Sequence, residues 1–364
     1  MTIGTVEFDL ASVLAEITDG KSAESLKFSN LVNIEYQATR NVGAYSALKT
    51  GVTCGNKIGF IDLGNSYDFL KSTDGLSSGC EYNEQDVKVT TSVKKWDTHN
   101  YNGEVVWCIK DLECAFKEYM GLPINADKTP ENAFSAFLVT YFRDNLQRSH
   151  WTRVWFTDSS AATSSKLFGG DGLWLQTIAA ANANNNVITI TENASGTYAE
   201  QTALSASRGF DVFSAIHKKA TKSRKLRGKK AQLKILTTED LALNYLDYLR
   251  ENNQVNCCFK SDVTQDVYNE MNLNIFGMPI EIVYEWDDII QGGEFADLDD
   301  GTKFSSPHRA LLTYANNIPF GVSSQSMLDD VELVYDPIKK NLHIRSEYDL
   351  GTAVIFDDEL ILAI

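Results

Sequence analysis

The stretch that most constrains the fold is Thr129–Trp151, TPENAFSAFLVTYFRDNLQRSHW, because its pattern predicts one long helix. Thr129 suits an N-cap, Pro130 suits the first helical position, and Glu131 suits the positive end of the helix dipole. Apolar and aromatic side chains then recur at helical spacing, at Phe134, Phe137, Leu138, Tyr141 and Phe142. At about 1.5 Å per residue the helix would be roughly 30 Å long. Such a stripe would be insoluble if exposed, so we expect a sheet or another helix to cover it.

Length and charge bound the class of protein. A chain of 364 residues corresponds to roughly two to three domains, and 43% hydrophobic residues are enough for a sizeable core. Asp and Glu number 49 against 33 Lys and Arg, a net charge of −16, which disfavours a general nucleic-acid binder. The six cysteines form no CxxC pair, and the sequence shows neither a signal peptide nor an apolar run of about 18 residues. These features predict free thiols in a reducing cytoplasm and no membrane contact.

The N-terminal third contains little that would fold by itself. Residues 1–45 predict an arm with one short helix near Ala11–Ile17. Residues 46–109 are rich in glycine, and alternation at Val87–Val93 and Val105–Ile109 predicts two strands around the turn WDTHNYNG. An isolated hairpin is only marginally stable in water, so we expect a neighbouring subunit to cover it. The aromatic residues expected to make that contact are Trp96, Tyr101 and Trp107.

The sharpest charge feature is a basic cluster that follows a helix predicted at Phe210–Ala220. The cluster holds eight Lys and Arg residues and no acid. Its members are Lys218, Lys219, Lys222, Arg224, Lys225, Arg227, Lys229 and Lys230. One interpretation is a solvated face or a contact with the acidic surface of another subunit. The other is contact with nucleic acid or another acidic partner.

Strand and helix signals alternate through the rest of the chain. Residues 152–209 are small and polar, which weakens any helix prediction, and only VITIT at Val187–Thr191 indicates a strand. The strand AQLKIL precedes a helix that Thr237 or Thr238 caps. The apolar face of this helix is predicted to be Leu241, Tyr245, Leu246 and Leu249. A strand with a Gly-x-Pro turn near its start is predicted at Asn274–Tyr284. Further strands are predicted at Ala310–Tyr314, Val331–Tyr335, Leu342–Ser346, Ala353–Phe356 and Leu360–Ile364, with an acidic loop at 291–306. The turn DPIKKN suits a hairpin, and the whole order predicts an α+β fold.

The sequence carries no pattern that indicates catalysis. The five histidines are scattered without an HExxH motif, and neither GxSxG nor GxGxxG occurs. The acidic segment FADLDDGTKF departs from a calcium loop, because Asp297, Asp299 and Asp300 miss its spacing and its twelfth position is His308. We therefore predict no enzyme activity, no catalytic residue, no metal ligand and no cofactor.

The order of elements resembles the major capsid protein of tailed bacteriophages, the Hong Kong 97 fold. The loop at 46–109 looks like the family's extended loop, the helix at 129–150 like its spine helix, and GGDGLW at 169–174 like the segment after the spine. The run KAQLKILTTEDLALNYLDYLREN resembles the family's axial strand and capped helix. Two further segments, FGMPIEIVYEWDDI and ALLTYANNIPFGVSS, also resemble the family. Their matching turn residues are Gly277, Pro279, Asn316, Asn317 and Gly321.

The resemblance implies a Hong Kong 97-like α+β capsid fold with five parts. These parts are an N-terminal arm at 1–45, an extended β-hairpin loop at 46–109, a peripheral domain with the spine helix at 110–209, a central axial domain at 210–330, and closing strands at 331–364 that return to the peripheral domain. The chain lacks a long coiled-coil leader, so scaffolding would come from a separate protein.

The resemblance also implies a function. The chain would be a structural subunit that assembles as hexamers and pentamers into an icosahedral phage head around double-stranded DNA, which it would enclose without reading its sequence. Its partners would be scaffolding, portal and decoration proteins, and its location the virion after assembly in the host bacterial cytoplasm. An encapsulin-type nanocompartment shell is the nearest alternative, and a phage tail or adhesion module is another.

Overall fold

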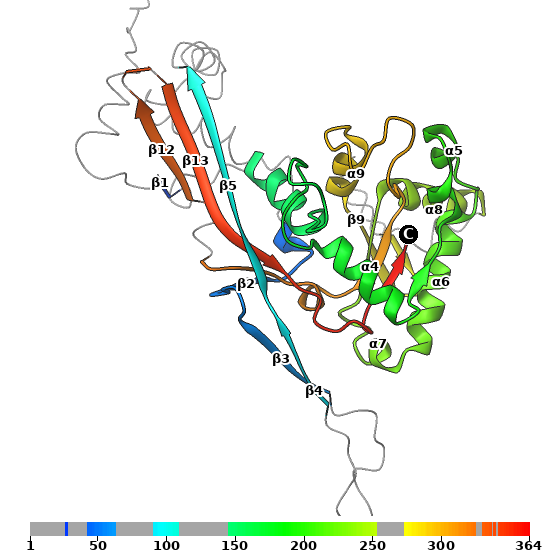
Figure 1. Ribbon diagram of the computed structural model, residues 1–364. Coiled ribbons are helices and arrows are strands. Elements are labelled where there is room, and N and C mark those ends of the chain that lie inside the picture. The colour runs from blue at the N-terminus through cyan, green and yellow to red at the C-terminus, as the bar shows by residue number, and fades with distance from the viewer. Residues whose placement is uncertain are drawn as a thin grey trace, which may run out of the picture.

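A computed structural model of the chain describes residues 26–27, 42–62, 90–108, 145–252, 273–324, 330–336, 338–339 and 341–364, which form two six-stranded sheets and one hairpin (Figure 1). The short helix predicted near Ala11–Ile17 and most of the spine helix predicted at 129–150 lie outside these residues. From residue 145 the backbone is helical through Trp155, beyond the predicted end at 150.

The first sheet, which we call the long sheet, is organised around a twelve-residue strand, β13. Its strands are β1 (Leu26–Lys27), β12 (Asp330–Asp336), β13 (Asn341–Thr352), β11 (Phe320–Val322), β2 (Leu48–Thr50) and β5 (Asp97–Cys108). β5 pairs antiparallel with β13 along its whole length, from Asp97 opposite Thr352 to Cys108 opposite Asn341. In Figure 1 the long strands β5, β12 and β13 extend away from the helices.

The second sheet, which we call the central sheet, lies among the helices (Figure 1). Its strands in order are β6 (Val187–Ile188), β14 (Ile361–Ala363), β10 (Ala310–Thr313), β7 (Lys234–Thr237), β9 (Met278–Ile282) and β8 (Leu273–Ile275). The helices of this part are α4 (Leu173–Ala183), α5 (Tyr198–Thr202), α6 (Arg208–Lys222), α7 (Arg224–Gly228), α8 (Glu239–Glu251) and α9 (Tyr284–Gln291). Three 3-10 turns are η2 (Val42–Ala44), η4 (Thr191–Ala194) and η6 (Ala315–Asn317). β3 (Lys57–Asp62) and β4 (Thr90–Lys95) form a separate antiparallel hairpin.

Both faces of the central sheet are buried. Leu236 of β7 belongs to a core that contains four tryptophans, whereas its neighbour Ile235 belongs to a second core with α6 and α8. β10 shows the same alternation and is buried at all four positions. In the first core the ring of Trp286 lies 4.8 Å from that of Trp155 and 4.6 Å from that of Trp174. The sheet is thus a middle layer between two apolar cores.

Several predicted elements are confirmed. The helix predicted at Phe210–Ala220 is α6, and α8 follows the N-cap Thr238 with its predicted apolar face buried. The strand within AQLKIL is β7, and the strands predicted at Ala310–Tyr314, Val331–Tyr335 and Leu360–Ile364 are β10, β12 and β14. The predicted DPIKKN turn joins β12 to β13, and the Asp336 carboxylate accepts hydrogen bonds from two backbone N–H groups of that turn.

The predicted pairing of the strands at 87–93 and 105–109 is wrong. Residues 96–103, expected to form the turn WDTHNYNG, belong mostly to β5, whose partner is β13. β4 pairs instead with β3, so the hairpin of this region closes between residues 57–62 and 90–95. The alternation of apolar residues was read correctly as strand, but it does not specify which strand is the partner.

Three further differences concern local structure. The helix α4 occupies a stretch that was expected to be loop-like, because an alanine-rich helix buried along much of its surface shows no clear polar face. The strand predicted at Asn274–Tyr284 has the predicted turn near its start, between β8 and β9, but it ends at Ile282 and α9 begins at Tyr284. Residues 353–356 form no strand, since the backbone N–H groups of Ile355 and Phe356 bond to the carbonyl and side chain of Asn317.

Candidate functional site

Trp96 lies at the joint between the β3–β4 hairpin and the long sheet. It separates β4 from β5, is 7% exposed, and packs against Val52 and Ala353. Gly321, predicted as a turn residue, lies instead within β11 and faces this indole. A Cβ on Gly321 would come within 2.8 Å of a Val52 methyl carbon and 3.0 Å of the Trp96 ring. These two predicted residues therefore form one close-packed joint inside the subunit.

The other two aromatic residues predicted for inter-subunit contact lie in β5. The Tyr101 hydroxyl accepts a hydrogen bond of 3.1 Å from the Gly170 N–H, and the Arg153 guanidinium lies 5.1 Å from the ring centre. Tyr101 is half-buried by its own subunit, which leaves little of its ring for a neighbour. Trp107 pairs in register with Leu342 of β13. Contact of these residues with another subunit stays a prediction.

One half of the basic cluster faces its own subunit. Lys219 donates hydrogen bonds of 2.7 and 2.9 Å to the backbone carbonyls of Asn185 and Val187. The Lys225 ammonium lies 2.8 Å from the Asp358 carboxylate. These lysines and Lys229 are half-buried, so part of the cluster's charge is already compensated within the chain.

The compensating acids form a triplet, Asp357–Glu359, that the sequence interpretation missed. Lys94 of β4 lies 2.6 Å from Asp357, and the Lys229 ammonium bonds to the buried Glu359 carboxylate and to the Tyr314 hydroxyl. With the Lys225 contact, each acid of the triplet binds a lysine. The triplet thereby fastens the β3–β4 hairpin and the basic cluster to the same segment. The sequence feature that could have indicated this contact is the run of three consecutive acidic residues just before the apolar C-terminal strand.

The other half of the basic cluster points outward. Its exposed members are Lys218, Lys222, Arg227 and Lys230. Lys230 lies beside the turn between β8 and β9, where its ammonium is 4.0 Å from the position of a Cβ on Gly277. In the same turn Phe276 is 57% exposed, and its ring centre is 4.7 Å from that of His217. Lys230, one of the outward basic residues, therefore lies beside the turn that carries an exposed aromatic side chain.

The turn itself explains the predicted Gly-x-Pro pattern. Phe276 and Gly277 have φ values of 47° and 79°, the signs of a two-residue hairpin turn that favours glycine. Pro279 lies in β9 opposite Asn274, on a part of the strand that is exposed. The Gly-x-Pro pattern is therefore explained by the backbone conformation that this turn requires.

Asn317, another predicted motif residue, is fully buried and ties two segments together. Its side-chain oxygen accepts a 2.7 Å hydrogen bond from the Phe356 N–H, and its amide donates to the Phe356 carbonyl at 3.1 Å and the Thr313 hydroxyl at 3.2 Å. Asn317 belongs to η6 and Thr313 to β10, whereas Phe356 lies in the connection between β13 and β14. Asn317 therefore fixes the position of the segment that immediately precedes the acidic triplet.

Carboxylates gather where β7 and β9 end. The two strands are parallel, so α8 and α9 start at the same edge of the central sheet. The Asp287 carboxylate accepts a 2.8 Å hydrogen bond from the Glu239 N–H. Burial raises the pKa of Asp287 to about 8, and the neighbouring carboxylates of Asp240, Glu239 and Asp288 act in the same direction. This edge is therefore crowded with negative charge.

The acidic loop after α9 uses its carboxylates in local hydrogen bonds. Asp300 accepts from the N–H groups of Thr302 and Lys303 at 2.8 and 2.9 Å, and Asp299 accepts from Gly301 at 2.9 Å and from the Tyr198 hydroxyl. These bonds turn the loop back on itself. In the described part of the chain, no group of three or more metal-ligating side chains converges.

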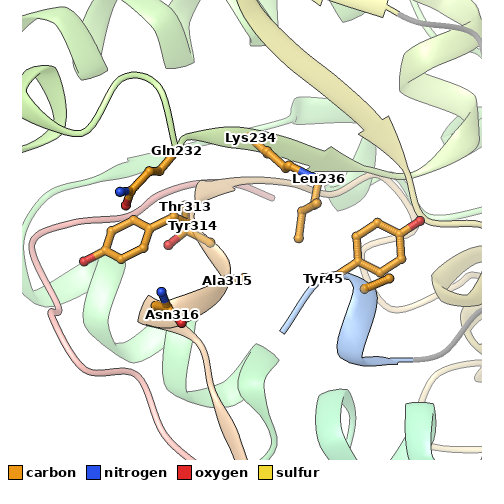
Figure 2. Close-up of a pocket in the computed structure, with 9 residues that line it drawn as sticks. Tyr45, Gln232, Lys234, Leu236, Thr313, Tyr314, Ala315 and Asn316 are labelled. Atoms are coloured by element: carbon orange, nitrogen blue, oxygen red, sulfur yellow. The ribbon is translucent and has the colours of Figure 1, made fainter. Parts of the chain in front are cut away.

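A small pocket lies between η2 and the edge formed by β7 and β10. Its volume is about 180 Å³, below the roughly 300–1,000 Å³ usual for small-molecule sites. Figure 2 shows Tyr45 and Tyr314 at its two ends, with Lys234 and Gln232 along one side. The pocket has room for a few water molecules, so it is not the principal candidate site. Within the described residues, no helix has the length and apolar character needed to cross a bilayer.

The comparisons with known proteins gave structural matches alone. No protein-family model and no curated protein sequence matches the chain. A chain of Mycobacterium phage Ogopogo aligns with a TM-score of 0.50 at 11% identity, covering 91% of this chain and 94% of that one. A chain of Gordonia phage Cozz gives 0.49 at 12% identity over 91% and 90%, and a chain titled as the capsid of a native GTA particle gives 0.44 at 11% over 99% of both.

The first of these matches decides the fold. At 11% identity the sequences share little, yet the two backbones correspond over more than nine-tenths of both chains. Members of a family that shares the order and shape of its elements, but few invariant residues, are expected to be similar in fold and dissimilar in sequence. The chain therefore shares its mixed helix-and-sheet fold with a chain of a phage, in agreement with the Hong Kong 97-like fold that its sequence resembles.

Proposed function

We propose that this chain is a major capsid protein, a structural subunit whose copies assemble into an icosahedral phage head around double-stranded DNA. The observation that carries the proposal is the correspondence in fold, over 91% of this chain, with a chain of a phage. A fold alone does not define a function, so the proposal also depends on surfaces that suit assembly.

The long sheet and the β3–β4 hairpin are such surfaces. β5 is exposed from Asn102 to Val106, and Val105 and Val106 are 42% and 47% exposed. A long strand with exposed valines at a sheet edge is a site where another chain can pair or pack. In a shell each such contact is repeated many times, so each can be modest in strength.

Partners follow from this function as part of the proposal. Hexamers and pentamers of the chain would form the shell, and separate scaffolding, portal and decoration proteins would control its size, entry point and surface. DNA would be enclosed without sequence-specific contact, in keeping with a net charge of −16. The location would be the virion, after assembly in the host bacterial cytoplasm, and no enzyme activity is proposed.

The experiment is assembly of the full-length chain, expressed in bacteria, with sedimentation velocity and negative-stain microscopy as readouts. Shells, tubes or capsomer rings are the expected result. A compact monomer at every concentration, with or without phage scaffolding protein, would contradict the proposal. Closed shells that form without other phage proteins and take up a cargo protein instead of DNA would favour the encapsulin-type alternative, and trimers or fibres would favour a tail module.

A further inference from the structure

The two ends of the central sheet carry opposite charges, and the order of the sequence produces this arrangement. The basic cluster immediately precedes β7, whereas the acidic first turn of α8 immediately follows it. β9 runs parallel to β7, begins at the turn beside Lys230 and ends at the acidic helix α9. A five-residue strand spans about 17 Å, so one chain cannot bring the two ends together. Figure 1 shows α7 and α9 at opposite ends of this part of the molecule.

The basic end presents the four outward residues of the basic cluster, Lys218, Lys222, Arg227 and Lys230. None of the four forms an ion pair with another described residue, whereas the inward Lys225 and Lys229 are held by the acidic triplet. The exposed ring of Phe276, in the turn beside Lys230, adds an apolar contact at this end. Burial, with a further contribution from Lys230, lowers the pKa of His217.

The acidic end presents Asp288, Glu294, Asp297 and Asp300, all exposed. The cations near them are Lys303, which is exposed, and Arg309, which is buried. The Arg309 guanidinium faces inward, over the rings of Phe156 and Trp174, and it donates to the carbonyls of Ser305 and Ser306. The outer carboxylates of this end are therefore left for a cation from elsewhere.

We propose that the basic end of one copy binds the acidic end of the next copy around a ring. The partner is thus a second copy of this chain, and the contact is head to tail. A contact between two different surfaces of the same subunit closes into a ring when the rotation permits. This inference rests on the proposed capsid function and adds the pair of surfaces that orders subunits within a capsomer.

Charge complementarity favours a second copy over DNA as the partner of the basic end. The chain has 49 acidic against 33 basic residues, so another copy offers an acidic surface in abundance. The acidic end is joined to the basic end by β7 and β9, so every copy that presents one surface also presents the other. DNA at the basic end would instead be repelled by the rest of the subunit.

Charge reversal of each end tests the proposal. The triple variant K218E/K222E/R227E reverses the basic end, and D288K/E294K/D297K reverses the acidic end. Each alone should lower the yield of particles and rings by at least tenfold, while the six substitutions together in one chain should restore it. The control R148E, compared with K222E alone, makes the same change in net charge at an exposed residue outside both ends and outside the long sheet, and it should retain assembly. Circular dichroism of free subunits checks folding, and the milder K218Q/K222Q/R227Q replaces any variant that fails to fold.

A mixture of the two reversed variants gives a sharper test. One variant then has two acidic ends and the other has two basic ends, so neither can contact its own kind. Mixed in equal amounts, they should alternate around six-membered rings but not five-membered ones. Native mass spectrometry should therefore find mixed hexamers, and microscopy should find open sheets or tubes in place of closed shells.

The outcomes separate this inference from the proposed function. Wild-type shells with no rescue in the six-substitution chain would overturn the head-to-tail contact and leave the capsid function standing. Normal shells from K218E/K222E/R227E with less packaged DNA would show that the basic end faces DNA, which also overturns the inference. Failure of the wild-type chain to form rings or shells would contradict the proposed function and the inference together.

Discussion

The central sheet and the long sheet have six strands each, yet they are stabilised in different ways. In the central sheet β10 is buried at all four positions and has a core on each face. In the long sheet β5 is exposed from Asn102 to Val106. The central sheet has within its own chain the apolar burial that drives folding, whereas the long sheet exposes surface that another molecule can bury.

The two sheets also differ in how they hold charge. Burial raises the pKa of Asp287 at the edge of the central sheet. In the long sheet the hydrogen bond from Arg345 and that from His343 lower the pKa of the exposed Glu104. A buried carboxylate among like charges is destabilised, and an exposed one between two donors is stabilised. The exposed face of the long sheet therefore uses cross-strand polar pairs, whereas the central sheet has an apolar core on each face.

The largest expected effect follows from this contrast in burial. Trp286→Ala should lower the free energy of unfolding by about 3–5 kcal/mol, because it empties the centre of the tryptophan core. Val106→Ala in β5 should change it by less than about 0.5 kcal/mol in the free subunit. Urea denaturation of free subunits measures both. Equal losses would mean that the long sheet is as self-sufficient as the central one.

The joint at Trp96 should be the exception within the long sheet. Gly321→Val should cost about 1–3 kcal/mol, since the new methyl groups would overlap Val52 and the indole. Gly103→Ala in β5 is the matched control, because a Cβ there meets no atom within 4 Å. Thermal melting of the two variants compares them directly. If both melt like the wild type, the joint is looser than its contacts indicate.

The acidic edge of the central sheet should respond to pH. The pKa of Asp287, about 8 in the folded chain, lies above its unfolded value, so the stability it contributes is complete below about pH 4 and is lost as pH rises through 8. The wild type should lose up to about 1.4 kcal/mol per pH unit in this window from this one proton. Asp287→Asn should remove that slope, and Asp288→Asn at an exposed position should keep it. Denaturation midpoints at pH 5, 7 and 9 decide the matter, and a slope unchanged in Asp287→Asn would contradict it.

The smallest effect distinguishes the two halves of the basic cluster. Lys225→Ser breaks the partly exposed pair with Asp358 and should cost about 0.2–1 kcal/mol in the free subunit, less at high salt. Lys222→Ser and Arg227→Ser should leave that stability unchanged and alter the salt response of assembly instead. Melting curves and particle yields at 50 and 500 mM salt provide both readouts. If the inward and outward variants show the same melting temperature and the same salt response, the basic cluster does not consist of two functionally different halves.

The sequence predicts structure that depends on contacts between residues close together in the chain, and it does not predict structure that depends on contacts between distant residues. The helix α8 was identified with its cap and its buried face because those signals lie within one turn of each other. The partner of β5 was not, because β13 lies more than 230 residues further along the chain. The basic cluster was visible as a run of charge, but its division into halves depends on Asp358 and Glu359, which only the folded chain brings near. Gly321 was found by resemblance, and its reason, the ring of Trp96, is likewise a long-range contact.

Hydrogen exchange in free subunits and in assembled particles tests the central claim most directly. The account predicts that amides of β3 and β4 exchange at least a hundredfold more slowly in particles than in free subunits, because a neighbour covers the hairpin. Amides of β7 and β10 should be equally protected in both, since their partners lie within the chain. If β3 and β4 are already as protected in the free subunit as in the particle, the hairpin is stabilised by its own chain, and the contrast between the hairpin and the central sheet is wrong.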